Sequence, residues 1–375
     1  MAGPLSIVGA GDVVANRLLP ALLDSHSLPS PADIVVFTID ASDSLLSQLA
    51  AAGVDVHVRD EARIVDEVIA RGAPVVIATP SDAHLRYLYA IAPAHIRCAV
   101  EKPLTSVATE VDELERRTPD LASTFFALSY YGLEKALPLA FFLNPRREFD
   151  PFLEYDGTTP LDELRTKLGA LRSVRIDLLE GPERSPTGVR RAWTEAGGGL
   201  AFETLIHPLI LARKFARYVH APWREFLPSI RQGRFAQAAV GGSITFLRLD
   251  GALDGVEVTL TAGKYVQPPS LRRGGVAVFD GGTMRFDFDE MAATITTSAG
   301  RCGHLRVRSR YAGKYRVQTA LMLQFFAAGW PPGSERFDDL FDQMDVLTWL
   351  HDRRLDEGAS FEYGTDQSAL VAALA

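Results

Sequence analysis

The sequence predicts an α/β fold in two domains, with a parallel sheet near the amino terminus and a mostly antiparallel open sheet after it. Over residues 5–130, short apolar runs alternate with amphipathic segments of helical period, which is typical of a parallel sheet with helices on both faces. Beyond residue 170, strand-like runs are separated by Asp-Gly pairs that favour hairpins. The length of 375 residues is sufficient for two hydrophobic cores.

The first domain is expected over residues 1–130. Its strands are predicted at 5–8, 34–39, 54–58, 74–78, 96–100 and 123–129, and its helices at 16–22, 44–52, 64–71, 84–92 and 106–117. A second, α+β domain is expected over residues 131–375, and its closing helices can pack back on the first domain.

The second domain is expected to combine several helices with many strands. Its helices are predicted at 134–142, 161–168, 200–215, 315–328 and 337–354, and its strands at 172–179, 243–249, 256–262, 276–279, 284–288 and 293–297. Hairpin turns are predicted at 250–251, 254–255 and 280–282, and residues 144–159 are expected to form a surface loop.

A Gly-x-Gly turn follows the first strand and precedes a helix. Glycines there allow a tight turn and close approach of a pyrophosphate to the helix N-terminus, where free N–H groups favour anions. We therefore expect Gly9, Gly11, Asp12 and Val13 to contact a dinucleotide cofactor. Val14 stands where the third glycine of the usual fingerprint would lie.

Asp40 ends the second predicted strand. An acidic residue at this place hydrogen-bonds the adenosine ribose in NAD-binding folds. The alternative is that Asp40 caps the following helix, although Ser42 and Asp43 can also provide the cap. Residues 41–44 contain no Arg or Lys to meet a 2′-phosphate, so NAD is favoured over NADP.

The tripeptide Glu101-Lys102-Pro103 closes the predicted strand 96–100. Ligands of open α/β sheets bind at the carboxyl ends of the strands, and Lys102 is one of only six lysines in the chain. A cation fixed there can stabilise negative charge that develops on a substrate oxygen. The alternative is a Glu-Lys pair on a solvated loop.

Glu203 and His207 are four residues apart in a predicted helix, behind three consecutive glycines at 197–199. On a helix they share one face, and a carboxylate beside an imidazole fixes its tautomer and favours its protonated form. This suits a general acid/base. The alternative is a pair that satisfies itself within a core.

These motifs resemble those of the glucose–fructose oxidoreductase / inositol dehydrogenase / rhizopine-catabolism (Gfo/Idh/MocA) family. The matching residues are Gly9-Ala10-Gly11, Leu19-Pro20-Ala21-Leu22, Ala78-Thr79-Pro80 with His84, Glu101-Lys102-Pro103, and Gly197-Gly198-Gly199 with Glu203 and His207. The resemblance implies an NAD-dependent oxidoreductase acting on a secondary alcohol or ketone of a sugar, sugar nucleotide or cyclitol.

The resemblance also implies roles for individual residues. Lys102 would polarise the substrate oxygen, His207 would carry the hydroxyl proton, and Glu203 would orient His207 or bind a neighbouring hydroxyl. Further cofactor contacts are expected from Thr79, Pro80, His84, Glu101 and Lys102, and further substrate contacts from Tyr131 and Trp193. The family usually has Asp where this chain has Glu203, which leaves the substrate stereochemistry open.

Several of these residues have simpler explanations. Tyr131 and Trp193 can be packing residues, and His84 can cap the helix that it begins. Two other functions remain open. One is a catalytically silent protein of the same fold that senses a cofactor or sugar, and the other is a phosphosugar dehydrogenase.

Composition limits the partners of the chain. A net charge of −8 and a pI of about 5.6 argue against nucleic acid and anionic membranes. Cys98 and Cys302 form no metal-binding motif, and no metal is expected because Lys102 supplies the electrophile. Without a signal peptide or membrane span, the expectation is a cytoplasmic homodimer or homotetramer, associated through the second sheet.

Overall fold

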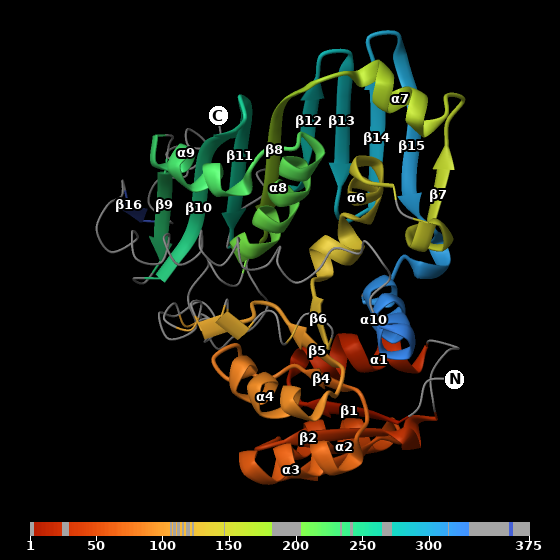
Figure 1. The fold of residues 1–375 in the computed structure, drawn as a ribbon, viewed down its shortest axis with the longest axis vertical. Helices are drawn as coiled ribbons and strands as arrows, with labels where there is room; N and C mark the ends of the chain where they lie inside the picture. Colours follow the sequence, from red (N-terminus) through yellow and green to blue (C-terminus); the bar gives the residue numbers. More distant parts are fainter. Residues whose placement is uncertain are drawn as a thin grey trace. The chain divides into compact units, whose positions relative to one another are not determined.

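The chain divides into two compact units, shown as ribbons in Figure 1. The first unit comprises Met1–Glu134 and Arg310–Phe341, and the second comprises Lys135–Ser309 and Asp342–Ala375. The computed structural model describes residues 4–24, 30–105, 107, 110, 113–114, 116–117, 121, 124–145, 147–181, 204–232, 235–240, 243–264, 272–313, 315–329 and 360–362. The first unit is therefore assembled from two separate stretches of sequence.

The first unit contains a six-stranded parallel sheet in the order β3-β2-β1-β4-β5-β6. Its strands are β1 (Leu5–Val8), β2 (Ile34–Thr38), β3 (Asp55–Val58), β4 (Val75–Ile77), β5 (Cys98–Glu101) and β6 (Phe125–Leu128). All six expected strands are confirmed. The strand order reverses between β1 and β4, and dinucleotides bind at such a reversal, outside the carboxyl ends of the strands.

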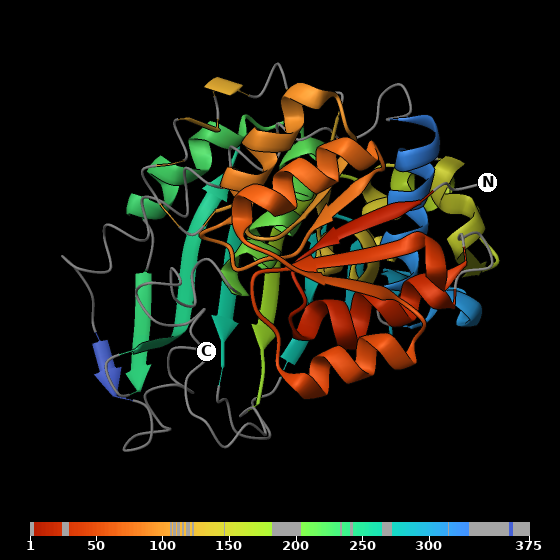
Figure 2. The same cartoon turned by 90° about the horizontal axis from the view of Figure 1, so that it is seen from below.

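Two layers of helices enclose this sheet (Figure 2). They are α1 (Leu19–Leu23), α2 (Asp43–Ala51), α3 (Glu61–Arg71), α4 (His84–Ile91) and α10 (Arg316–Ala328). α3 contacts α4, and α1 contacts α10. α1 is preceded by a π-helical turn at Val14–Leu18, in which Val14 is fully buried. The side chain at the third fingerprint position is therefore part of the core.

Helix α10 is capped at both ends by side chains from far away in the sequence. The carboxylate of Glu134, which is fully buried, accepts three backbone hydrogen bonds at its start. The donors are the N–H groups of Tyr315, Val317 and Gln318, at 2.7, 3.2 and 3.4 Å. At its end, Arg97 donates to the carbonyl of Phe326 over 2.6 Å. These bonds satisfy backbone groups that a helix leaves open at its termini.

The second unit contains a ten-stranded sheet in the order β16-β9-β10-β11-β8-β12-β13-β14-β15-β7. Its strands are β7 (Leu153–Asp156), β8 (Leu171–Leu179), β9 (Phe235–Val240), β10 (Ser243–Leu253), β11 (Val256–Gly263), β12 (Arg272–Phe279), β13 (Gly282–Asp287), β14 (Ala292–Thr297), β15 (Gly300–Val307) and β16 (Ser360–Glu362). Among the strand pairs that the structure describes in this sheet, only β11–β8 and β16–β9 are parallel, which confirms the mostly antiparallel sheet.

The described helices of this unit lie on one face of the sheet (Figure 1). They are α6 (Leu137–Leu143), α7 (Leu161–Leu168), α8 (Ile206–Tyr218) and α9 (Phe226–Gln232). α8 contacts β8 and β11, α6 contacts β14 and β15, and α9 contacts β10. The helix predicted at 337–354 lies outside the described residues. No helix in the described part of the chain is long and apolar enough to cross a bilayer.

Two predictions for the second unit are wrong. The segment 144–159, expected to be a loop, contains strand β7, which pairs with β15 at the edge of the sheet. The pair Asp250-Gly251 is not a turn, because β10 continues through it and Gly251 pairs with Val258. A Cβ on Gly251 would lie 2.8 Å from the Ser229 hydroxyl of α9, so glycine is required there for close helix–sheet packing.

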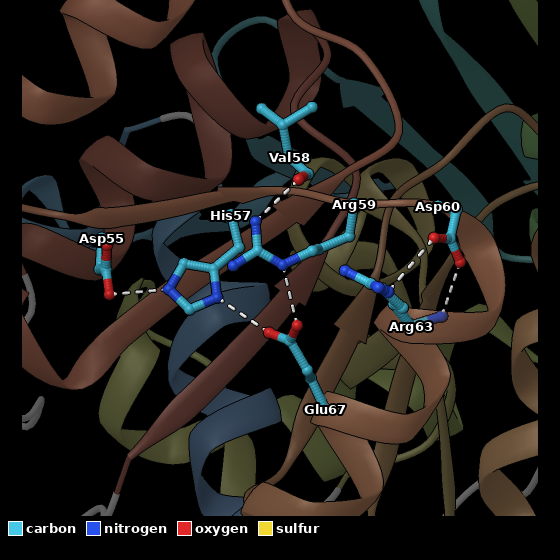
Figure 3. A network of polar contacts seen from close by, with 7 residues as sticks. All are labelled: Asp55, His57, Val58, Arg59, Asp60, Arg63 and Glu67. Carbon is cyan, nitrogen blue, oxygen red and sulfur yellow. Dashed lines mark hydrogen bonds and ion pairs between the residues drawn. The ribbon is translucent and has the colours of Figure 1, made fainter.

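A charged network joins the edge strand β3 to α3 (Figure 3). The His57 ring lies between two carboxylates, with Nδ1 3.0 Å from Glu67 and Nε2 3.0 Å from Asp55. The second carboxylate oxygen of Glu67 accepts a 2.9 Å hydrogen bond from Arg59. The hydrogen bond that the His57 ring donates to Glu67 is the main reason why the pKa of His57 is raised, with a smaller contribution from Asp55.

This network is expected to make stability depend on pH. Because the pKa of His57 is raised by folding, its stabilising effect is complete below the reference pKa of 6.5 and is lost as pH rises through the folded value. His57→Gln should therefore lower the free energy of unfolding by up to about 1 kcal/mol more at pH 5.5 than at pH 9. Thermal unfolding at both pH values tests this, and an equal loss at both would contradict it.

Candidate active site

The carboxyl ends of β1, β4 and β5 meet at one edge of the first sheet. The strands are parallel neighbours, with Ile7 beside Val76 and Ile77 beside Val100. The glycine turn, the turn after β4 and the Glu101-Lys102-Pro103 turn therefore start side by side. The sequence alone predicted that Lys102 lies at this edge of the sheet. The strand order places the Lys102 turn two strands away from the glycine loop.

The two glycines of the first turn have different roles. Gly9 has a φ of 106°, and a Cβ on it would lie 2.5 Å from the carbonyl oxygen of Ala78. Only glycine fits there, because the turn packs directly on the segment after β4. At Gly11 a Cβ would meet nothing within 4 Å, so the backbone borders open space. An open backbone just before the first helical turn is accessible to an anion such as the pyrophosphate of a dinucleotide.

Asp12 begins the segment that follows these glycines. Its exposed carboxylate accepts a 2.8 Å hydrogen bond from Asn16 and forms an ion pair with Arg17 at 3.6 Å. Asp12 and Val13 are thus held in the first turn after the glycine loop, and their contact to a phosphate would come from backbone N–H groups. The residues present fit a dinucleotide.

Asp40 is exposed just beyond β2, next to the glycine strand in the sheet. The hydroxyl of Ser42 accepts from the N–H of Leu45 and caps α2, so Asp40 is not needed as the cap. The sequence alone did not identify Arg59, which follows β3, as a charged residue beside the end of β2. Its N–H donates to the carbonyl of Thr38 at the end of β2, and its guanidinium is bound by Glu67. The pairing of β3 with β2 is the signal that could have indicated this position of Arg59.

Glu101 is the last residue of β5 and is only 6% exposed. One carboxylate oxygen accepts from the Lys102 N–H over 3.3 Å, and the Lys102–Pro103 peptide bond is cis. Burial raises the pKa of Glu101 to about 7, although the charge of Lys102, the Tyr315 hydroxyl and Arg17 act in the opposite direction. A buried acid of this kind changes its charge near neutral pH.

The titration of Glu101 should be visible in stability. Because its pKa is raised by folding, the cost of burying the carboxylate is absent below about pH 4.5 and complete above about pH 7. Glu101→Gln should therefore stabilise the protein at pH 8 by roughly 3 kcal/mol relative to its effect at pH 4.5. Denaturant unfolding at both pH values measures this. A difference that does not change with pH would show that Glu101 has an ordinary pKa.

His84 begins α4 and is 1% exposed. Its Nε2 lies 2.7 Å from the carbonyl oxygen of Thr79 and its Nδ1 lies 2.8 Å from that of Pro103. The ring therefore bridges the turn after β4 and the turn after Lys102. Thr79 and Pro80 themselves are partly to well exposed at this edge.

Comparison with solved structures identifies the architecture. A Gfo/Idh/MocA family oxidoreductase from Vibrio cholerae matches with a TM-score of 0.62 and 15% identity, covering 95% of this chain and 100% of that one. The chain has the Gfo/Idh/MocA fold. No family model matches the sequence, and no curated protein sequence matches it.

Two further structures share the Gfo/Idh/MocA fold with this chain. UDP-N-acetylglucosamine 3-dehydrogenase from Acidithiobacillus ferrooxidans matches with a TM-score of 0.63 and 16% identity, over 95% of this chain and 97% of that one. Biliverdin reductase from Synechocystis, in complex with biliverdin and NADP+, matches with a TM-score of 0.62 and 15% identity, over 93% of this chain and 98% of that one. The fold thus serves different substrates.

The remaining candidate residues of this Gfo/Idh/MocA fold are divided between the two units. Tyr131 is 6% exposed in the first unit, in the π-helical turn Tyr131–Lys135 that follows β6. His207 is in the second unit, in the first turn of α8, and is also 6% exposed. Trp193 and Glu203 lie outside the described residues.

Proposed function

We propose that the chain is an NAD-dependent oxidoreductase that transfers hydride between nicotinamide and a secondary alcohol or ketone of a sugar, sugar nucleotide or cyclitol. The observation that carries this proposal is the shared sheet edge of the open Gly9–Gly11 turn and the Lys102 turn. The similarity in fold to a sugar-nucleotide dehydrogenase supports the substrate class.

The chain's own residues supply binding and proton chemistry around the cofactor. Backbone N–H groups from Gly11 to Val13 would hold the pyrophosphate, and Thr79 and Pro80 would border the cofactor further along the edge. When bound there, a nicotinamide would supply the hydride acceptor or donor of the reaction. Glu101 sets the charge beside Lys102 at this edge.

The substrate oxygen is assigned to Lys102 and His207. The ammonium of Lys102 stabilises negative charge on that oxygen, and His207 takes or returns the hydroxyl proton. Glu203 orients His207, and Tyr131 and Trp193 contact the substrate. These roles need no metal, because Lys102 is the electrophile.

The substrate class is tested with a panel of polyols, keto-sugars and sugar nucleotides, using NAD, NADH and their phosphorylated forms and following absorbance of the reduced nicotinamide. Biliverdin belongs in the panel because biliverdin reductase from Synechocystis has the same fold. Turnover of a sugar or cyclitol would support the proposal. Binding of cofactor without turnover across the panel would support the sensing alternative.

Cofactor preference should depend on Asp40. Its exposed carboxylate would accept from the ribose 2′-hydroxyl of NAD and repel the 2′-phosphate of NADP. Asp40→Ser should weaken NAD binding and strengthen NADP binding, changing the ratio of their Kd values by about tenfold or more. Calorimetric titration measures both constants.

Asp43→Ser is the matched control, since Asp43 lies on α2, outside the ribose position. Wild-type protein that binds NADP as tightly as NAD would contradict the role of Asp40. In that case Arg59, held by Glu67 beside the end of β2, would be the candidate phosphate partner.

Association of subunits is proposed to use the outer face of the second sheet. Helices α6, α8 and α9 contact its other face, and the outer face has paired charges of both signs. Arg175 binds Asp177 at 2.9 Å, and Arg248 binds Asp250 at 3.1 Å. A surface with both signs can meet its own copy across a two-fold axis as a homodimer or homotetramer.

A further inference from the structure

His84 connects two turns at the ligand edge of the first sheet. Its two ring nitrogens lie 2.7 Å from the carbonyl oxygen of Thr79 and 2.8 Å from that of Pro103. Thr79 follows β4, and Pro103 immediately follows Lys102 after β5. One buried side chain therefore ties the segment that carries Lys102 to the neighbouring strand end.

The segment after β4 is itself fixed against the glycine loop. The N–H of Ala78 donates to the carbonyl of Val8 over 2.8 Å. A Cβ on Gly9 would lie 2.5 Å from the Ala78 carbonyl oxygen, so the two backbones are in direct contact. Because Thr79 follows Ala78, His84 links the Lys102 turn to the loop that would hold the cofactor phosphates.

The chemistry of the two partners defines the state of the ring. Both are carbonyl oxygens, which only accept hydrogen bonds, and a neutral imidazole has one N–H whereas an imidazolium has two. Burial, the largest effect, lowers the pKa of His84, and the charge of Lys102 also lowers it. The two carbonyls and Asp82 raise it. The neutral ring that burial favours donates to one of the two carbonyls and keeps its second nitrogen beside the other, whereas the protonated ring donates to both.

We propose that His84 is a positioning residue for Lys102, because its ring holds the Lys102 turn at a fixed place relative to the glycine loop. The inference rests on the proposed function, in which the amine of Lys102 acts on the substrate oxygen. Both ring nitrogens of His84 are engaged by backbone carbonyls, so its role differs from the direct cofactor contact expected from the sequence.

A test that does not depend on activity uses the small number of lysines. Reductive ¹³C-methylation labels the six lysines and the N-terminus, and Lys102→Arg identifies the Lys102 signal. In His84→Phe, which keeps a ring but removes both nitrogens, the Lys102 signal should move by more than its line width. The signals of the other five lysines should stay in place.

His95→Asn is the matched control. His95 is an exposed histidine at the amino-terminal side of β5, and asparagine tolerates its left-handed φ of 56°. This variant should leave all six lysine signals unchanged. If His84→Phe does not fold, His84→Asn replaces it, because the smaller amide side chain cannot reach both carbonyls at once.

A kinetic test separates positioning from binding. His84→Phe should lower kcat by about 10²-fold, the effect of a reacting group displaced by about 1 Å. The Kd of the cofactor, measured by fluorescence titration, should stay within about threefold of the wild-type value. His84→Asn, which can still donate to one carbonyl, should recover part of kcat.

The outcomes separate the inference from the function on which it rests. A wild-type protein without turnover would reject the proposed function, and the lysine signals would still decide the role of His84. An unchanged Lys102 signal in folded His84→Phe would overturn the inference. A loss of cofactor affinity as large as the loss of kcat/KM would also overturn it, in favour of a cofactor-binding role.

Discussion

Lys102→Ala is expected to abolish turnover while cofactor affinity is largely retained. Lys102 lies in the turn after β5, at the edge of the sheet where the glycine loop also begins. Removing one donor that stabilises a developing oxyanion costs about 10²–10³-fold in kcat, and the loss of a full positive charge should reach the upper end of this range. Steady-state kinetics with the best substrate of the panel, together with NADH titration, measures both effects.

Lys167→Ala provides the matched control for this substitution. Lys167 is a half-exposed lysine of α7, paired with Glu163 at 2.7 Å, and its removal should leave kcat unchanged. Turnover in Lys102→Ala within tenfold of wild type would show that another group polarises the substrate. Ligand binding that is intact in Lys102→Ala, with no turnover in the wild type, would point to the sensing alternative.

His207→Asn is expected to remove the pH dependence of alcohol oxidation. If His207 is the general base, the rate rises with pH as its imidazole loses a proton. Its loss should cost about 10²–10⁴-fold in rate, the usual contribution of a positioned acid or base. Cofactor affinity should be nearly unchanged. Rate profiles between pH 5 and 10 for wild type and variant test this.

His220→Asn is the control, because His220 lies just beyond the same helix, is exposed, and has a φ of 57° that asparagine accepts. Glu203→Gln should reduce the plateau rate, since the imidazole would be less well oriented. A pH profile that is the same in His207→Asn and wild type would exclude His207 as the proton carrier. Lys102 and Tyr131 would then be the candidates for that role.

Most strands of the first sheet were predictable because they are short, predominantly apolar runs, whereas β3 (Asp-Val-His-Val) alternates polar and apolar residues at the edge of the sheet. β7 was not, because its sequence Leu-Glu-Tyr-Asp is half polar and its edge position depends on pairing with β15. The turn predicted at Asp250-Gly251 failed for a related reason. Gly251 allows the strand to pack closely on a hydroxyl of α9. The local sequence does not distinguish a glycine with this role from a glycine in a turn.

The candidate site shows the same limit. The sequence places Gly9 and Lys102 at strand ends, and parallel pairing then brings those ends to one edge. The role of His84 was not predictable, because its partners are backbone carbonyls, which leave no sign in side-chain identity. Arg59 was missed because its relevance depends on which strand lies beside β2.

The capping of α10 by Glu134 has a consequence for biosynthesis. When Glu134 is added to the chain, its three N–H partners are still about 180 residues from being made, and a buried carboxylate without donors is costly. The ring of Phe126, likewise, can pack on Phe325 only after that helix has been made. The first unit therefore begins to form first and is completed only after strands β7 to β15 of the other unit have been synthesised. A nascent chain stalled after Glu134 and before α10 would expose apolar side chains of the first unit to chaperones.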